Sequence, residues 1–339
     1  MTPRPISRRR FAAGASALLT SIAVIRRPAC AAQFSYKYAS NLSVDHPLNV
    51  RMKECWRAVF RETKGRLEVQ VFPNNVLGGD TQALQQLRSG ALQFFTLDGG
   101  ILQSVVPVAA IQAVGFAFKN SAEAFGAMDG ALGDYVRDEI RKAALYVHPK
   151  MWENGMRQVT SSTRPIRTPA DLDGFKIRTP PGALWVDLFK SLGAAPAPLN
   201  FSEVYTALQT HVFDGQENPY AIIDTARLYE VQKYLSVTNQ MWSAYHFLGN
   251  GDAWKALPPD IQAIVERNLA TYALLQRRDT QLRNDSLADK LGRRGMTINV
   301  ADGAALRAKL AASGFYTRWR DKFGPQAWAL LEKTSGKLA

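Results

Sequence analysis

The pattern of hydrophobic and polar residues alternates along the chain between the period of a strand and the period of a helix. This alternation predicts strands that are followed by helices. Residues 67–71 alternate with period two, as in a strand, whereas the segment 47–64 begins at a proline and ends before Gly65, as helices commonly do. Strands alternating with helices favour an α/β fold with a mainly parallel sheet covered on both faces. Similar patterns predict further strands at 34–39, 91–97, 145–152, 175–178 and 296–300, and further helices at 80–89 and 122–142.

One predicted helix is unusually long. From Pro259 to Arg294, apolar residues recur near helical spacing between Ile261 and Leu287. An unbroken helix of this length would reach roughly 50 Å. That is more than a single α/β lobe requires. The remaining tail, 303–333, is predicted to form short helices whose aromatic residues pack against the body of the protein.

The first 32 residues have the composition of a targeting segment. Ser7-Arg8-Arg9-Arg10-Phe11 precedes an apolar run, and small residues follow from Ala29. The apolar run is shorter than the roughly 20 residues that a membrane helix needs. The paired arginines before a phenylalanine favour a twin-arginine export signal, cleaved near Ala32. This predicts a periplasmic protein.

The net charge and the cysteine content limit the classes of function that the chain can have. The chain has a formal net charge of +13, but its leader holds six arginines and no acids, so the rest carries about +7. These cations are scattered, so nucleic-acid binding has little support. Cys55 is left without a partner for a disulfide, and the four histidines lack ligand spacing. Known catalytic motifs are absent as well. We therefore expect no enzyme activity, cofactor or metal.

The segment 171–219 holds the clearest candidate chemistry. Arg178 ends a predicted strand beside a Pro-Pro-Gly turn, where its guanidinium could bind a carboxylate with two hydrogen bonds. On spacing alone, a structural ion pair with Asp171, Asp173 or Asp187 is an equal alternative. Ser202 is predicted to cap a helix that ends before Asp214. A rigid turn at 216–219 is predicted to present amide side chains.

Three motifs stand out in this segment: Asp171-Leu172-x-Gly174-x-Lys176-x-Arg178, Phe201-Ser202-Glu203-Val204-Tyr205-x-Ala207-Leu208-Gln209-Thr210 and Asp214-Gly215-Gln216-Glu217-Asn218-Pro219. By these motifs the segment resembles the solute-binding proteins of TRAP (tripartite ATP-independent periplasmic) transporters, the dicarboxylate-binding-protein-like family. The resemblance covers essentially the whole chain after the leader. It implies a two-lobed periplasmic-binding-protein architecture, with a ligand cleft between the lobes and a long helix spanning both. It also implies that residues 33–154 plus about 244–283 form lobe I, and 155–243 plus about 284–339 form lobe II.

The resemblance also implies roles for individual residues. Arg178 would form the two-pronged salt bridge to a solute carboxylate. Arg157, which the bare sequence favours as a solvated strand residue, would by the resemblance add a second cation. Asn218 would add an amide hydrogen bond, and Phe201 would pack against the solute. The remaining candidates are Asp98, which could repel an anion or accept a hydrogen bond from a hydroxyl, Asn41 in the first loop, and Trp185 and Trp242. These two tryptophans, with Trp152 and Tyr245, lie near segments that line the cleft in the family. They would either face a solute with an apolar or aromatic body or pack in the core.

The function implied is non-enzymatic capture of an organic acid by hinge closure. The solute would be delivered to separate small and large TRAP membrane subunits. A simple mono- or dicarboxylate is favoured over a sialic-acid-like polyhydroxylated solute, because residues 180–185 offer few hydrogen-bonding side chains. The alternatives are an exported enzyme acting on an organic acid and the binding subunit of a sensory receptor.

Overall fold

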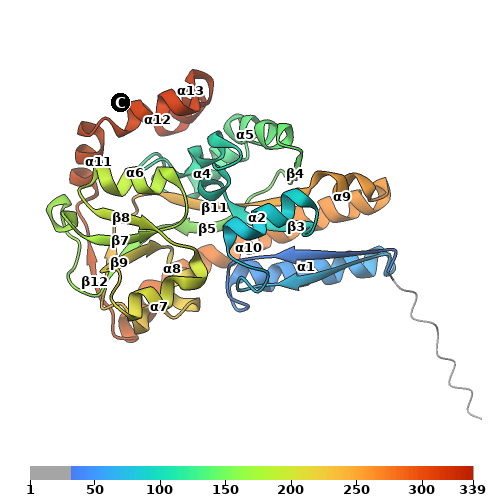
Figure 1. Cartoon of the computed structure of the whole chain (residues 1–339), viewed down its shortest axis with the longest axis horizontal. Helices are drawn as coiled ribbons and strands as arrows, with labels where there is room; N and C mark the ends of the chain where they lie inside the picture. Colours follow the sequence, from blue (N-terminus) through green and yellow to red (C-terminus); the bar gives the residue numbers. More distant parts are fainter. Residues whose placement is uncertain (1–31, 339) are drawn as a thin grey trace, which may run out of the picture. The chain divides into compact units, whose positions relative to one another are not determined.

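The computed structural model describes residues 32–338 and contains two six-stranded sheets (Figure 1). The predicted targeting segment therefore lies almost entirely outside the described residues. In the first sheet the strand order is β2-β1-β3-β11-β4, with β5 also paired to β11. β1 runs parallel to β2 and β3, whereas β11 is antiparallel to β3, β4 and β5. These strands are β1 (Phe34–Ala39), β2 (Leu67–Phe72), β3 (Phe94–Asp98), β4 (Leu145–Val147), β5 (Trp152–Met156) and β11 (Trp242–Asn250).

The second sheet has the order β12-β10-β6-β9-β7-β8. β7 is parallel to β8 and β9, but β6 is antiparallel to β9 and β10. Both sheets are thus mixed, and the expectation of a mainly parallel sheet is wrong in this respect. Their strands are β6 (Gln158–Ser161), β7 (Lys176–Thr179), β8 (Ala195–Pro198), β9 (Gly215–Asn218), β10 (Tyr234–Val237) and β12 (Thr297–Val300).

The chain crosses between the sheets three times: residues 251–296 form one long connection, and the other two connections are short and adjacent. One joins β5 to β6 through Arg157, and the other joins β10 to β11. The backbone N–H of Arg157 donates to the carbonyl of Met241 at 2.9 Å, which ties the two connections together. β5 pairs with β11, and β6 pairs with β10, both in antiparallel fashion. The chain therefore leaves the first sheet and re-enters it at neighbouring positions. This adjacency explains why the sheets contain antiparallel pairs.

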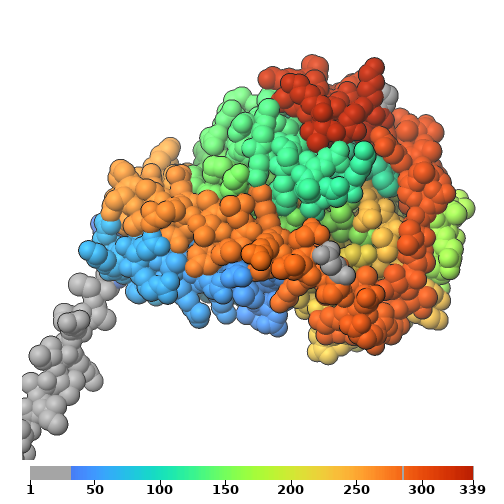
Figure 2. Space-filling view, turned by 180° about the vertical axis from the view of Figure 1, so that it is seen from behind, coloured from blue at the N-terminus to red at the C-terminus, as the bar shows by residue number. Residues whose placement is uncertain are grey.

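Helices cover both sheets, and the long predicted helix is confirmed as α10. It packs against α1 and β5 beside the first sheet, and against α8 and β12 beside the second. Figure 2 shows it in orange next to the blue α1. The helices are α1 (Pro47–Glu62), α2 (Asp80–Ser89), α3 (Gly99–Leu102), α4 (Ser121–Met128), α5 (Ala131–Lys142), α6 (Ala183–Ser191), α7 (Val204–Gln209), α8 (Tyr220–Thr225), α9 (Gly251–Ala256), α10 (Pro259–Arg293), α11 (Gly303–Ala312), α12 (Phe315–Phe323) and α13 (Pro325–Ser335).

Two predicted elements are divided in the structure. The helix expected over 122–142 is two helices, α4 and α5, because Gly130 between them adopts an extended conformation. The strand expected over 145–152 separates into β4 and β5. Pro149 lies in the gap, where it has no N–H to offer a strand ladder.

Two local predictions in the segment 171–219 are wrong. Ser202 does not cap a helix: it lies within a 3-10 turn, Phe201–Glu203, and α7 begins after it without a side-chain cap. Residues 216–218 form strand β9 rather than a turn. β9 lies between β6 and β7, so its neighbours supply the backbone hydrogen bonds that make it a strand.

The C-terminal helices contact elements beside both sheets. α13 packs against α4 and α5, whereas α11 and α12 pack against α6. The aromatic residues of this tail are buried in the same hydrophobic cluster as Trp185. The proposed lobe boundaries stay a prediction.

Candidate functional site

A narrow cavity lies between the two sheets and is lined by side chains from both. The space among its lining residues is about 330 Å³, but a water-sized sphere can occupy only about 20 Å³ of it. That is room for roughly one water molecule. The cavity is lined by Asn41, Leu42, Asp80, Asp98, Ile101, Arg157, Arg178, Pro180, Trp185, Phe201, Asn218, Ile222 and Tyr245.

Strand and helix ends place the polar groups of this cavity. Asp98 is the last residue of β3, and its side chain caps α3 by accepting from the N–H of Gly100 at 2.8 Å. A Cβ on Gly100 would lie 2.1 Å from the ring of Trp185, so glycine at this position lets the indole approach. On the opposite side, Arg178 lies in β7 and Asn218 ends β9. The cavity is thus formed where the ends of strands from two sheets face each other.

Arg178 is a buried cation without an anionic partner. Its residue is only 1% exposed, and its Nε and Nη2 both donate to the carbonyl of Leu199, at 2.9 and 2.5 Å. Within residues 32–338, no carboxylate lies within ion-pair distance of it, and its Nη1 makes no hydrogen bond. Burial lowers the pKa of Arg178 to about 9. An incoming carboxylate would supply the missing partner.

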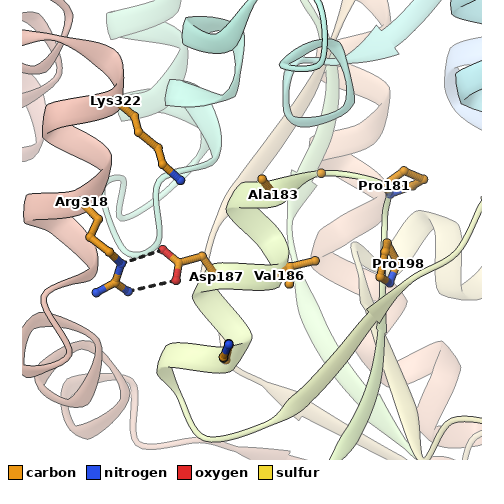
Figure 3. Close-up of a pocket in the computed structure, with 9 residues that line it drawn as sticks. Pro181, Ala183, Val186, Asp187, Pro198, Arg318 and Lys322 are labelled. Atoms are coloured by element: carbon orange, nitrogen blue, oxygen red, sulfur yellow. Dashed lines mark hydrogen bonds and ion pairs between the residues drawn. The ribbon is translucent and has the colours of Figure 1, made fainter.

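The structural ion pairs considered for Arg178 are not formed. Asp187 instead accepts from Arg318 at 3.0 Å, beside a more open pocket between α6 and α12 that Figure 3 shows. Asp173 pairs with Lys309 at 2.9 Å. Asp171 accepts from the backbone N–H of Thr168 at 2.8 Å. All three acids are therefore occupied elsewhere, and the alternative interpretation of Arg178 is wrong.

Arg157 is as deeply buried as Arg178, but it has an anionic partner within the protein. Its Nε and Nη2 bind the two oxygens of Glu217 at 2.5 and 2.7 Å. Its Nη1 donates to Ser243 at 3.2 Å, and Nη2 also reaches Oδ1 of Asn218 at 3.0 Å. Burial alone would lower the pKa of Arg157, but Glu217 outweighs burial and the pKa is raised. All three guanidinium nitrogens thus have partners within the protein.

The wall formed by the first sheet is acidic. Asp98 is occupied, because Ser243 donates to its second oxygen at 2.5 Å. Asp80, the first residue of α2, accepts from Asn41 at 3.1 Å through Oδ2, whereas its buried Oδ1 has no partner. Burial raises the pKa of Asp80 to about 6. Oδ1 of Asn41 and the indole N–H of Trp185 are also buried without partners.

Seven of the eight residues predicted for the site line this one cavity: Arg178, Arg157, Asn218, Phe201, Asp98, Asn41 and Trp185. Trp242 does not. Its ring packs edge-on against Phe118 and Phe125, and its indole N–H donates to Glu153 at 3.1 Å.

Sequence reasoning placed Tyr245 near the cleft but missed one polar residue of the cavity, Asp80. Asp80 begins a predicted helix, where an acid also stabilises the helix dipole, so its position carried no separate signal of a binding site. Tyr245 lies in β11, which pairs it with Asp98 in the neighbouring β3.

Comparison with known proteins identifies the family of this chain. The family described as "Bacterial extracellular solute-binding protein, family 7" matches residues 38–314. The chain belongs to this family. Its members and structural neighbours include TRAP periplasmic solute-binding proteins.

Relatives of this TRAP solute-binding protein cover most of its length. The 2,3-diketo-L-gulonate-binding periplasmic protein of Escherichia coli is 33% identical over 262 residues, which is 77% of each chain. An uncharacterized protein of Sinorhizobium fredii is 37% identical over 261 residues, which is 76% of this chain but 48% of that protein. The chain therefore spans about half the length of this second relative.

A solved structure shares the fold of this solute-binding protein. The TRAP periplasmic solute-binding protein of Roseobacter denitrificans with bound L-galactonate aligns with a TM-score of 0.83 and 31% identity. The alignment covers 88% of this chain and 99% of that one. Within residues 32–338, no helix combines the length and apolar character that a membrane span requires. The same residues contain no group of three or more acidic, histidine or cysteine side chains that could hold a metal ion.

Proposed function

We propose that this TRAP solute-binding protein captures a sugar acid in the periplasm and delivers it to TRAP membrane subunits. The observation that carries this proposal is the buried, unpaired Arg178 at a cavity between two sheets. Its relatives support the choice of solute class, since one is described as binding 2,3-diketo-L-gulonate and another holds L-galactonate.

The solute carboxylate would bind Arg178. One carboxylate oxygen would accept from the free Nη1 and the other from Nη2, which now donates to Leu199. Charge-assisted hydrogen bonds of this kind contribute about 1.5–3 kcal/mol each. Arg157 would have a different role, because Glu217 already neutralises it. It would position Asn218, whose Oδ1 it holds.

The acidic wall favours hydroxyl groups at the other end of the solute. The unpaired oxygens of Asp80 and Asn41 can accept hydrogen bonds from hydroxyls. Tyr245 also lines the cavity. A second carboxylate placed there would face Asp80 and Asp98, and like charges at short range disfavour binding. We therefore replace the sequence-based preference for a simple mono- or dicarboxylate with a hydroxylated monocarboxylate.

The size of the cavity supports a mechanism of hinge closure. Free space of about 20 Å³ cannot admit a sugar acid, so the solute must enter when the two sheets lie farther apart. The connections through Arg157 and before β11 would act as hinges, because they are short and lie side by side. Closure would then surround the carboxylate and remove it from water.

The proposal also includes an export signal and two membrane partners. Residues 1–32 would act as the twin-arginine signal, and separate small and large membrane subunits would accept the solute. We propose no catalytic role, since none of the described cavity residues forms a nucleophile–base pair of the kind that acyl transfer requires. Turnover of a bound sugar acid would contradict this part of the proposal and favour the exported enzyme.

A thermal-shift screen tests the solute class. The chain from Gln33 onward is unfolded and refolded to remove carried-over solute, and then incubated with L-galactonate, 2,3-diketo-L-gulonate, succinate or neutral galactose. A ligand that binds only the native state raises the melting temperature. We expect shifts with the two sugar acids, small ones with succinate and none with galactose. The shifts should vanish in Arg178→Ala and persist in Arg278→Ala, which removes an exposed arginine of α10. A shift with galactose that Arg178→Ala leaves unchanged would contradict the proposed site.

A further inference from the structure

A groove of about 500 Å³ lies between α1 and β2, outside the solute cavity and lined by none of its residues. Its floor is apolar and consists of Trp56, Phe60, Val69 and Val71. Phe60 is 44% exposed, which is unusual for a phenylalanine within a helix that packs on a sheet. An exposed apolar surface of this kind is a candidate for contact with another molecule.

The groove follows a free sheet edge. β2 is the terminal strand of the first sheet and pairs only with β1 among the described strands. The N–H groups of Phe34 and Ser40 donate to the carbonyls of Arg66 and Phe72, so the even-numbered residues of this strand face β1. Backbone groups alternate in direction along a strand, so Val69 and Val71 turn theirs toward the open edge. The side chains of the same two residues line the groove.

Three cations border the groove at regular spacing. Lys53, Arg57 and Arg61 recur every fourth residue of α1, and all three are exposed. Within the described part of the chain, none of them forms an ion pair. Their spacing along the helix is about 6 Å. Alternate residues of an extended strand are about 6.6 Å apart, which is nearly the same repeat. Glu68 is the one acid that lines the groove, so the groove has a net positive charge.

We propose that this groove binds an extended segment of another polypeptide that carries an acidic side chain at every second position. The segment adds as a strand to β2 and hydrogen-bonds to the backbone of Val69 and Val71. Its acidic side chains face α1 and pair with the three cations. A second copy of this chain does not fit, because pairing β2 with β2 would bring two cationic stripes together. The surface is separate from the proposed solute site.

Peptide binding to the chain from Gln33 onward tests the proposal. The probe is a fluorescently labelled peptide, Val-Glu-Thr-Glu-Thr-Glu-Val, titrated at low salt and followed by anisotropy. Arg57→Glu should weaken its binding by at least about tenfold, because it reverses the central charge. Arg278→Glu is the matched control, since Arg278 is also an exposed arginine in mid-helix without an ion pair in the described residues. It should change the affinity by less than about twofold.

Further probes separate strand addition from simple charge attraction. A peptide with lysine in place of glutamate should not bind. A peptide N-methylated at the residues that face β2 should also lose binding, because it cannot donate to the strand edge. Equal binding of the N-methylated and unmodified peptides would overturn the strand-addition proposal. So would an unchanged affinity in Arg57→Glu, or binding of this surface to phosphatidylglycerol vesicles but not to the peptide. Unaltered melting temperatures of both variants establish that each is folded.

Discussion

The two buried arginines of the proposed solute cavity, Arg157 and Arg178, differ in what surrounds them. Glu217 binds both prongs of Arg157, whereas Arg178 reaches only a backbone carbonyl. The pKa of Arg157 is raised and that of Arg178 is lowered to about 9, although both are buried. The comparison indicates that a buried cation in this cavity can be paired with a carboxylate of the protein, or can be left unpaired and able to bind the carboxylate of a ligand. The choice depends on whether a carboxylate of the protein is already in contact.

Removing Arg157 should have the largest effect on stability. Arg157→Met would leave Glu217 buried without its cation, and breaking a buried pair in this way costs about 3–5 kcal/mol. Urea unfolding of the wild type and the variant measures the loss. The double variant Arg157→Met with Glu217→Met should recover part of it, because both charges are then gone. An equally unstable double variant would mean that the loss comes from packing rather than from the unpaired acid.

Removing Arg178 should instead affect binding. We expect Arg178→Met to weaken sugar-acid affinity by about 2–5 kcal/mol, because the solute carboxylate would be buried unpaired. The unfolding free energy of the unliganded protein should fall little, or rise, since an unpaired buried cation is removed. Calorimetric titration and urea unfolding give the two values. An affinity loss below fivefold would place the carboxylate elsewhere.

Asp80 should make the stability of the unliganded protein depend on pH. Its pKa is raised to about 6 from 3.8, so the native state keeps the proton that the unfolded chain releases. The native state therefore loses stability as pH rises from about 4 to about 6, and the full penalty is present above 6. Asp80→Asn should remove this penalty. We expect it to stabilise the unliganded protein by about 3 kcal/mol at pH 7, but not at pH 4.

The same substitution should weaken binding of a hydroxylated solute, because an amide offers one acceptor oxygen and Asn41 already donates to that position. Unfolding curves at several pH values and a titration at pH 7 check both effects. A stability gain that is equal at pH 4 and pH 7 would show that the proton on Asp80 is not its source.

Trp242 should show the smallest effect on affinity. Trp242→Phe removes the hydrogen bond to Glu153 but no group that lines the cavity. We expect the Kd for a sugar acid to change by less than about twofold, with a stability loss of about 1 kcal/mol. Trp185→Phe is the matched comparison and should weaken binding more, because its indole lies in the cavity and its N–H is unpaired. Equal losses of sugar-acid affinity in both variants would indicate that Trp242 belongs to the binding site after all.

Much of this site could be predicted from local patterns. Seven predicted residues meet in one cavity, whereas the carboxylate-binding role that the motif around Arg178 indicates stays a prediction. The structure decided which of the arginines is available, because Glu217 approaches Arg157 only through the pairing of β6 with β9. It also placed the Trp242 side chain among Phe118 and Phe125, although β11 itself runs beside the cavity.

The amino-acid sequence alone determined the family, most helices and strands, and the long helix α10. These depend on periodicity, capping residues and contiguous motifs, which act over a few turns of chain. Only the tertiary structure decided that Asp80 faces Arg178 across a cavity, that residues 216–218 are a strand, and that the edge of β2 lies open beside three cations. Each of these depends on contacts between residues far apart in the chain. Such contacts set the burial, partners and pKa of a group that local sequence leaves undetermined.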